Sequence, residues 1–380
     1  MERLIYLDNG ATTKVDERVL SKMLPYFSIN YGNPSSAYFL GRRNKRVIEE
    51  ARNEVAFNIG AKQKEIYFTS CGSESDNLAL KGIAYENKHK GKHIITSKIE
   101  HPAILNTCAT LERQGFEITY LNVDSNGFVK LEELENLIRA DTILISIMFA
   151  NNEIGTIEPI EEIGKIAKRN DIYFHTDAVQ AIGNVKIDVQ KMNIDLLSMS
   201  AHKFYGPKGV GALYVKEGVN FERIQDGGHQ EKGKRSGTEN VAGIVGLAEA
   251  IKYSYKEYEH NNKKILDLRN YFISRLNKID NDIKINGDLE KRLPGNINVT
   301  FSNIDGGQLL LKLDEYGICA SAGSACSTGD SKPSHVLTSI GLSKAEVLGT
   351  LRFTLGKENS KTEIDYTIKI LNNILKNMKS

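Results

Sequence analysis

Short apolar runs alternate with longer amphipathic stretches along the first two thirds of the chain. The runs have the length of buried β-strands, and the stretches between them carry apolar residues at helical spacing. The expected strands span residues 65–70, 93–97, 117–121, 142–148, 173–177 and 196–199. The expected helices span residues 41–57, 73–85, 101–114, 130–139 and 160–170. This alternation predicts an α/β fold whose large domain holds a mostly parallel sheet flanked by helices.

The pattern changes in the last third of the chain. Residues 241–277 form a long charged stretch that predicts one helix between two domains. Apolar runs separated by helical stretches follow at 297–301, 318–321 and 350–355. They predict a smaller α+β domain. The expected division is a large domain at 16–255 and a small domain made of 1–15 and 256–380.

Composition and charge narrow the class of protein. The chain has 380 residues, of which 40% are hydrophobic, and a formal net charge of +2. Acidic and basic residues are interspersed, so we expect neither a nucleic-acid partner nor a membrane partner. The first residues lack the apolar segment of a secretory signal, which predicts a cytoplasmic protein. Four cysteines without Cys-x-x-Cys spacing argue against a disulfide scaffold or a self-contained zinc site.

Polar and small residues follow several predicted strands at their C-terminal ends. They are residues 70–73, 97–101, 151–152, 177 and 200–203. Ligands of parallel sheets bind at this edge, so these residues predict one cleft. The turn-rich segment 8–13 has the composition of a pocket lip.

Lys203 and Asp177 suggest what the cleft holds. Lys203 lies at the exit of an apolar strand, where a single lysine most often just reaches solvent. Asp177 ends another apolar strand, with Gln180 three positions later. Pyridoxal phosphate needs a lysine for its Schiff base and an acid that keeps its pyridine nitrogen protonated. The pair therefore predicts a pyridoxal phosphate site.

Residues 71–77 follow a strand and open a helix, so the amides near Gly72 and Ser73 would face an anion. This pattern predicts a phosphate cradle, although it also fits an ordinary serine N-cap. Ser200 and His202 would supply further donors to the phosphate.

Three more polar residues each allow two interpretations. His101 begins a helix and could cap it, or could stack on the cofactor ring and carry protons. Gln180 could bind the ring hydroxyl or simply face solvent. Arg352 lies between apolar residues on a predicted strand, where it needs an anion. That anion could be a substrate carboxylate or a structural ion-pair partner.

Cys326 lies in a loop of small residues, at about 321–333, that is expected to move. An accessible thiolate there would be nucleophilic, although a chance surface cysteine would have the same sequence pattern. Cys319 belongs instead to the preceding apolar run.

These motifs, in this order, resemble the cysteine desulfurases of the NifS/IscS type. That group belongs to the class V aminotransferases, which are fold-type I pyridoxal phosphate enzymes. The matching segments are residues 7–13, 32–36, 69–77, 100–102, 151–155, 175–180, 200–209, 227–230, 235–240, 323–326 and 352–353. The resemblance spans the whole chain.

The resemblance implies a role for each candidate residue. Lys203 holds the cofactor, Asp177 binds its pyridine nitrogen, Gln180 binds its phenolic oxygen, and His101 stacks on its ring. The phosphate contacts match Gly72, Ser73, Ser200 and His202, with Thr238 reaching the phosphate from the neighbouring subunit of a homodimer. Asn152 and Arg352 match contacts to the substrate carboxylate, and Asn152 also matches a contact to the cofactor. Cys326 matches the cysteine that accepts sulfur.

The implied activity is conversion of L-cysteine to L-alanine, with the sulfur left as a persulfide on Cys326. An acceptor protein, such as an iron–sulfur scaffold, would then take the sulfur. A selenocysteine lyase or an aminotransferase on the same scaffold is the nearest alternative. A non-catalytic iron–sulfur scaffold is a more distant one, in which Cys326 would be a transient cluster ligand.

Overall fold

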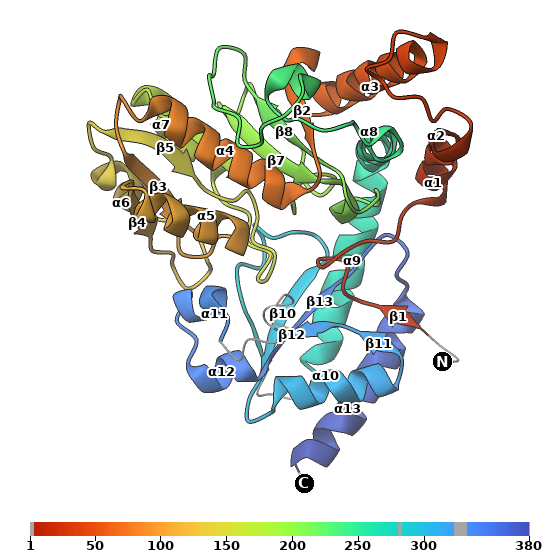
Figure 1. The fold of residues 1–380 in the computed structure, drawn as a ribbon. Coiled ribbons are helices and arrows are strands. Elements are labelled where there is room, and N and C mark those ends of the chain that lie inside the picture. Colours follow the sequence, from red (N-terminus) through yellow and green to blue (C-terminus); the bar gives the residue numbers. More distant parts are fainter. Residues whose placement is uncertain (1–3, 280–282, 323–332, 380) are drawn as a thin grey trace.

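A seven-stranded sheet forms the centre of the larger half of the molecule (Figure 1). The computed structural model describes residues 4–279, 283–322 and 333–379. In spatial order the strands are β2 (Ile66–Thr69), β8 (Gly211–Val215), β7 (Leu196–Ser200), β6 (Tyr173–Asp177), β5 (Thr142–Ser146), β3 (His93–Ser97) and β4 (Glu117–Leu121). Only β8 runs antiparallel to its neighbours within this sheet. The predicted fold class is confirmed.

Helices cover both faces of this sheet because successive strand residues point to opposite sides. Ile94 belongs to the core beneath α4 and α5, whereas its neighbour Ile95 belongs to the core on the opposite face. Leu196 and Leu197 divide in the same way. The helices and 3-10 turns of this half are α1 (Glu17–Met23), α2 (Pro25–Ser28), α3 (Phe39–Asn58), η1 (Gln63–Glu65), α4 (Gly72–Asn87), α5 (Pro102–Arg113), α6 (Leu131–Leu137), α7 (Ile160–Arg169), η2 (Ala201–Lys203), η3 (Gln230–Gly233) and α8 (Val241–Lys256).

A second, smaller half carries its own sheet and core. Its four-stranded antiparallel sheet has the order β12 (Ser321–Ala322), β13 (Thr350–Thr354), β10 (Asn296–Phe301) and β9 (Ile283–Ile285). Near the N-terminus, β1 (Ile5–Tyr6) pairs in parallel with β11 (Ile318–Cys319). Its helices are α9 (Tyr258–Leu276), α10 (Gly306–Glu315), α11 (His335–Ser339), α12 (Lys344–Leu348) and α13 (Lys361–Lys379). The division into domains at 1–15, 16–255 and 256–380 remains a proposal, which the separate cores support.

Two expected elements are each divided in the structure. The single helix expected over 241–277 is wrong, because the helix breaks at Glu257, which leaves α-helical geometry with φ −100° and ψ 8°. Helix α8 packs into the core of the large sheet and α9 into that of the small one, so the break lets each helix follow its own core. The apolar run at 318–321 is divided between two strands: β11 pairs with β1 and β12 pairs with β13.

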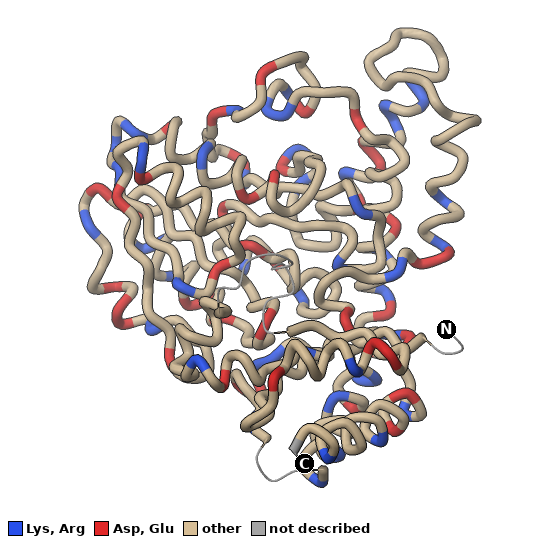
Figure 2. The backbone as a smooth tube through the Cα atoms, turned by 60° about the horizontal axis from the view of Figure 1, so that its bottom comes forward, with Lys and Arg blue, Asp and Glu red and all other residues tan. Residues whose placement is uncertain are grey.

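Charged positions of both signs are mixed along the chain in Figure 2. In the part of the chain that the structure describes, every helix is too short or too polar to cross a membrane.

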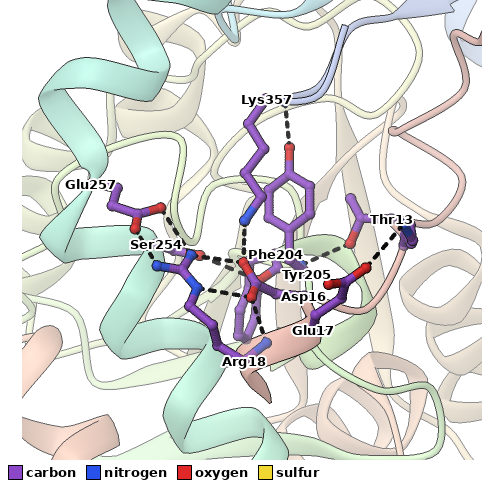
Figure 3. Close-up of polar contacts among 10 residues, drawn as sticks. Thr13, Asp16, Glu17, Arg18, Phe204, Tyr205, Ser254, Glu257 and Lys357 are labelled. Carbon is purple, nitrogen blue, oxygen red and sulfur yellow. Dashed lines mark hydrogen bonds and ion pairs between the residues drawn. The ribbon is translucent and has the colours of Figure 1, made fainter. Parts of the chain in front are cut away.

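A cluster of charged side chains ties the start of the chain to both halves (Figure 3). Asp16 accepts hydrogen bonds from Arg18, at 2.8 Å, and from Lys357, which precedes α13. Arg18 also binds Glu257 at the break between α8 and α9. Tyr205, two residues after Lys203, has a φ of 66° and donates its backbone N–H to Thr13 Oγ1 at 2.7 Å. The Tyr205 hydroxyl accepts the backbone N–H of Lys357 at 2.9 Å.

We expect Asp16→Asn to lower the free energy of unfolding at pH 7 by about 1–2 kcal/mol, because charged hydrogen bonds are lost. The Arg18 hydrogen bond holds the pKa of Asp16 well below its usual value, with Lys357 adding to the effect. Asp16 therefore stabilises the fold above its unfolded pKa of about 4, and this contribution fades as the pH falls below that value. Denaturant unfolding at pH 7 and pH 3 measures both effects. The control is Glu17→Gln at the exposed neighbouring position, and an equal loss in both variants would contradict the prediction.

Candidate active site

A cavity of about 360 Å³ lies at the C-terminal ends of the large sheet's parallel strands. The structure brings together there all the predicted site residues except Thr238 and Cys326. They are Gly72, Ser73, His101, Asn152, Asp177, Gln180, Ser200, His202, Lys203 and Arg352. The remaining lining residues are Gly10, Ala11, Cys71, Asp76, Met148, Ala150 and Val179.

Lys203 ends the 3-10 turn that follows β7, and its amine lies against the N-terminal segment. Its Nζ donates to the carbonyl oxygens of Gly10, at 2.6 Å, and Ala11, at 2.8 Å. Gln180 Nε2 donates to the same Gly10 oxygen at 2.9 Å. The segment expected as a pocket lip therefore positions the amine directly.

Asp177 closes β6 and is 6% exposed. Its Oδ1 accepts the N–H of Val179 at 2.9 Å, which fixes the plane of the carboxyl group. Burial raises the pKa of Asp177, while the nearby His101 and Lys203 oppose that rise. A cationic group in the cavity would favour the ionised form further. The protonated nitrogen of a pyridine ring is such a group.

The start of α4 fits an anion. Cys71 is the N-cap residue and makes no side-chain capping bond, so amides of the first turn remain available to a ligand. A Cβ at Gly72 would lie 2.6 Å from Val179 Cγ2 and 3.4 Å from Ser200 Cβ. Only glycine leaves space for an anion between Gly72, Val179 and Ser200, a part of the cavity that we call the anion corner. His202 completes the corner as a neutral ring, because burial and then Lys203 lower its pKa to about 4.

His101 has one ring nitrogen committed to the backbone. It is the N-cap residue of α5, and its Nδ1 accepts the N–H of Ala103 at 3.1 Å. The neutral ring therefore carries its proton on Nε2. Burial lowers the pKa of His101, and Asp177 partly offsets this effect. The capping interpretation and a place in the cavity both hold.

Arg352, on β13, is 1% exposed and has two kinds of contact. Its Nη2 donates to Asp8 Oδ1 at 2.8 Å, and its Nη1 donates to the Asn152 carbonyl oxygen at 2.9 Å. Its Nε has no partner among the described residues, although it is buried. A structural ion pair therefore exists, and the Arg352 side chain also lines the cavity.

Two titratable side chains near Asp177 were missed by the sequence analysis: one acid, Asp76, and one base, His175. Asp76 lines the cavity and is 1% exposed. His175 is fully buried between Ser146 Oγ, at 2.9 Å, and Ser198 Oγ, at 3.0 Å. Burial lowers the pKa of His175 to about 3, so this ring is neutral. The four-residue spacing between Gly72 and Asp76 places both on one helix face and could have indicated Asp76.

Thr238 and Cys326 are not placed in this cavity. Thr238 is exposed and lines a different hollow, beside Phe27 and Tyr31. Cys326 lies outside the residues that the structure describes.

Comparisons with known proteins agree with the chemistry of the cavity. The aminotransferase class-V family model matches residues 5–367. Cysteine desulfurase IscS of Methanosarcina thermophila is 54% identical over 378 residues, covering 100% of this chain and 93% of that protein. IscS of Clostridium botulinum strain Hall is 53% identical, covering 99% and 95%.

Solved structures give the same picture. A NifS-like protein superposes with a TM-score of 0.93 at 42% identity, covering 98% of this chain and all of that one. SspA, solved in complex with cysteine, gives 0.81 at 39% identity, covering 94% of this chain and 100% of that one.

The chain therefore belongs to the class V aminotransferase family. Within that family it falls with the NifS- and IscS-type proteins. Pyridoxal phosphate is the cofactor of this family, and the amine, the acid and the anion corner described above fit it.

We expect Gly72→Ala to raise the dissociation constant for pyridoxal phosphate about tenfold, because the added methyl group crowds the phosphate corner. The helix itself should tolerate alanine. Titrating apoprotein with the cofactor by absorbance measures this. Gly307→Ala, in the first turn of α10, is the matched control, since its Cβ would meet only Asp305 Oδ1 at 3.2 Å. An unchanged affinity of Gly72→Ala would place the phosphate elsewhere.

Proposed function

We propose that this protein is a pyridoxal phosphate-dependent cysteine desulfurase that converts L-cysteine to L-alanine. Its sulfur would pass to Cys326 as a persulfide and then to an acceptor protein, such as an iron–sulfur scaffold. One observation carries the proposal: Lys203, Asp177 and Arg352 share one cavity, in a chain about half identical to proteins named cysteine desulfurase IscS. A cytoplasmic location remains a prediction from the sequence.

Substrate binding would use the charged groups at one end of the cavity. Arg352 would meet the cysteine carboxylate where its side chain lines the cavity, while Asp8 and the Asn152 carbonyl oxygen fix the guanidinium plane. The Asn152 side chain would assist from the neighbouring wall. This arrangement orients the Cα–H bond of the substrate toward the amine of Lys203.

Proton movement would depend on Lys203 and His101. When bound, pyridoxal phosphate supplies an electron sink for the electron pair left when the Cα proton is removed. Asp177 keeps the pyridine nitrogen protonated. Lys203 takes the Cα proton and returns a proton to the product. His101 exchanges protons only through Nε2, because Nδ1 caps α5.

Sulfur transfer would form one bond and break another. The Cys326 thiolate attacks the sulfur of the substrate, so that an S–S bond forms and the substrate's C–S bond breaks. The electron pair of that C–S bond goes to the three-carbon fragment, which takes up protons and leaves as alanine. Cys326, now a persulfide, then passes its outer sulfur to the acceptor protein.

A homodimer with shared sites is the second part of the proposal. Thr238 lies outside the cavity of its own chain, in a loop that a buried ion pair anchors: Arg52 donates to Glu231 at 2.6 and 2.8 Å. Beside Thr238, the aromatic side chains of Phe27 and Tyr31 are 63% and 70% exposed. Exposed apolar groups of this kind suit a second copy of the chain.

The alternatives predict different products. A selenocysteine lyase or an aminotransferase would not form sulfide from cysteine through Cys326, and an iron–sulfur scaffold would form no alanine. The relatives named cysteine desulfurase favour the proposed reaction.

We expect Cys326→Ser to bind pyridoxal phosphate with an unchanged absorption band, but to lose sulfide release from L-cysteine by at least about a hundredfold. The thiol is needed for sulfur transfer and not for holding the cofactor. Alanine and sulfide assays measure the loss, and Cys319→Ser on β11 is the control. Turnover at the normal rate in Cys326→Ser would disprove the persulfide route.

Hybrid dimers test the sharing of sites. Lys203→Ala should be inactive, and Thr238→Ala should bind the cofactor at least about tenfold more weakly, because one hydrogen bond to the phosphate is lost. If Thr238 serves the neighbouring site, mixing the two variants creates dimers with one intact site and restores activity. If Thr238 serves its own subunit, both sites of the hybrid stay defective. Activity of mixed subunits at limiting cofactor distinguishes the two cases.

A further inference from the structure

Asp76 is a buried acid at the cavity for which the mechanism above has no use. It lies in the second turn of α4, one turn beyond Gly72, and is 1% exposed. Its Oδ1 has no hydrogen-bond partner among the described residues. A buried carboxyl oxygen without a partner is costly, and such an atom in a ligand cavity calls for an explanation.

Asp76 and Asp177 form a close pair of carboxyl groups. His101 lies beside them: one carboxyl oxygen of Asp76, one of Asp177 and one ring nitrogen of His101 are all within 4.8 Å of one another. Ionising both of two buried carboxyl groups this close costs much more free energy than ionising one, so one of them holds a proton near neutral pH.

The surroundings decide which carboxyl group is ionised. His101 and Lys203 favour a charge on Asp177. His175 Nε2 lies 3.8 Å from Asp76 Oδ1, but the ring is neutral and already bonded to Ser146 and Ser198. Burial and then the charge of Asp177 raise the pKa of Asp76 well above its usual value, against a hydrogen bond from Ser198. The titratable groups around Asp76 are Cys71, Glu100, His101, His175 and Asp177.

We propose that Asp76 is a positioning residue of the cofactor site: it stays protonated and acts as the neutral hydrogen-bonding neighbour that keeps Asp177 ionised beneath the pyridine ring. The inference rests on the proposed pyridoxal phosphate site and goes beyond it, because it assigns Asp76 a role that is exerted on Asp177. Without this neighbour, Asp177 would lie in more apolar surroundings and would itself take up a proton. The ion pair with the pyridine nitrogen would then weaken.

Infrared difference spectroscopy tests the protonation directly, on the full chain with and without cofactor at pH 7. The spectrum of the unaltered protein minus that of Asp76→Asn should contain the C=O stretch of a protonated carboxylic acid, which shifts in D2O. In Asp177→Asn the same band should disappear at a lower pH, because the neighbouring negative charge is gone. If no such band exists, Asp76 is ionised and the proposal is wrong.

Cofactor affinity tests the positioning role. Asp76→Asn cannot ionise but still donates a hydrogen bond, so its dissociation constant for pyridoxal phosphate should stay within about threefold of the unaltered protein. Asp76→Leu has no donor and should bind about tenfold more weakly. Glu86→Gln is the matched control, since it changes an acid to an amide near the other end of the same helix and should leave the affinity unchanged.

Equal weakening in Asp76→Asn and Asp76→Leu would overturn the proposal, because a charge would then be needed at this position. If Asp76→Leu does not fold, the infrared band and the Asp76→Asn affinity decide the question. Neither measurement depends on turnover of cysteine, so failure of this inference is distinguishable from failure of the proposed desulfurase activity.

Discussion

The arrangement of the site depends on one carboxyl group, Asp177, buried at the end of a strand, where the ionised form that a pyridine nitrogen would pair with is costly. Burial works against that charge, and the groups around the cavity oppose the effect of burial. The parallel sheet brings them together, because β6 and β7 end at the same edge and deliver Asp177 and Lys203 to one cavity. The starts of α4 and α5, after β2 and β3, then supply an anion corner and His101 to the same cavity.

Sequence patterns predicted most strands of the large sheet. The bounds of β3, β4 and β6 agree with expectation, including those of β4, which is only partly buried at the edge of the sheet. The break at Glu257 and the division of 318–321 could not be predicted locally, because each depends on which of two cores the flanking residues join. Strand β8 was missed because glycines and a proline of the preceding turn obscured its start.

The site was predictable to the extent that residues follow strands in a recognisable order. Lys203, Asp177 and the start of α4 have that signature. Asp76 has only its four-residue spacing from Gly72 as a signal, because an acid in the second turn of a helix otherwise has the pattern of an ordinary solvent-facing residue. For His101 and Arg352 the competing interpretations turned out to be compatible. His101 caps α5 while lining the cavity, and Arg352 is ion-paired with Asp8 while also lining the cavity.

The N-terminal segment lines the cavity of the candidate site although it lies far from the strand ends in sequence. Gly10 and Ala11 hold the Lys203 amine, and Asp8 orients Arg352 from the same short stretch. Ile5 and Leu7, just before it, are fully buried. For protein engineering this makes the first dozen residues a poor place for a purification tag, a linker or a trimmed end, whereas an appendage after α13 would leave these contacts untouched.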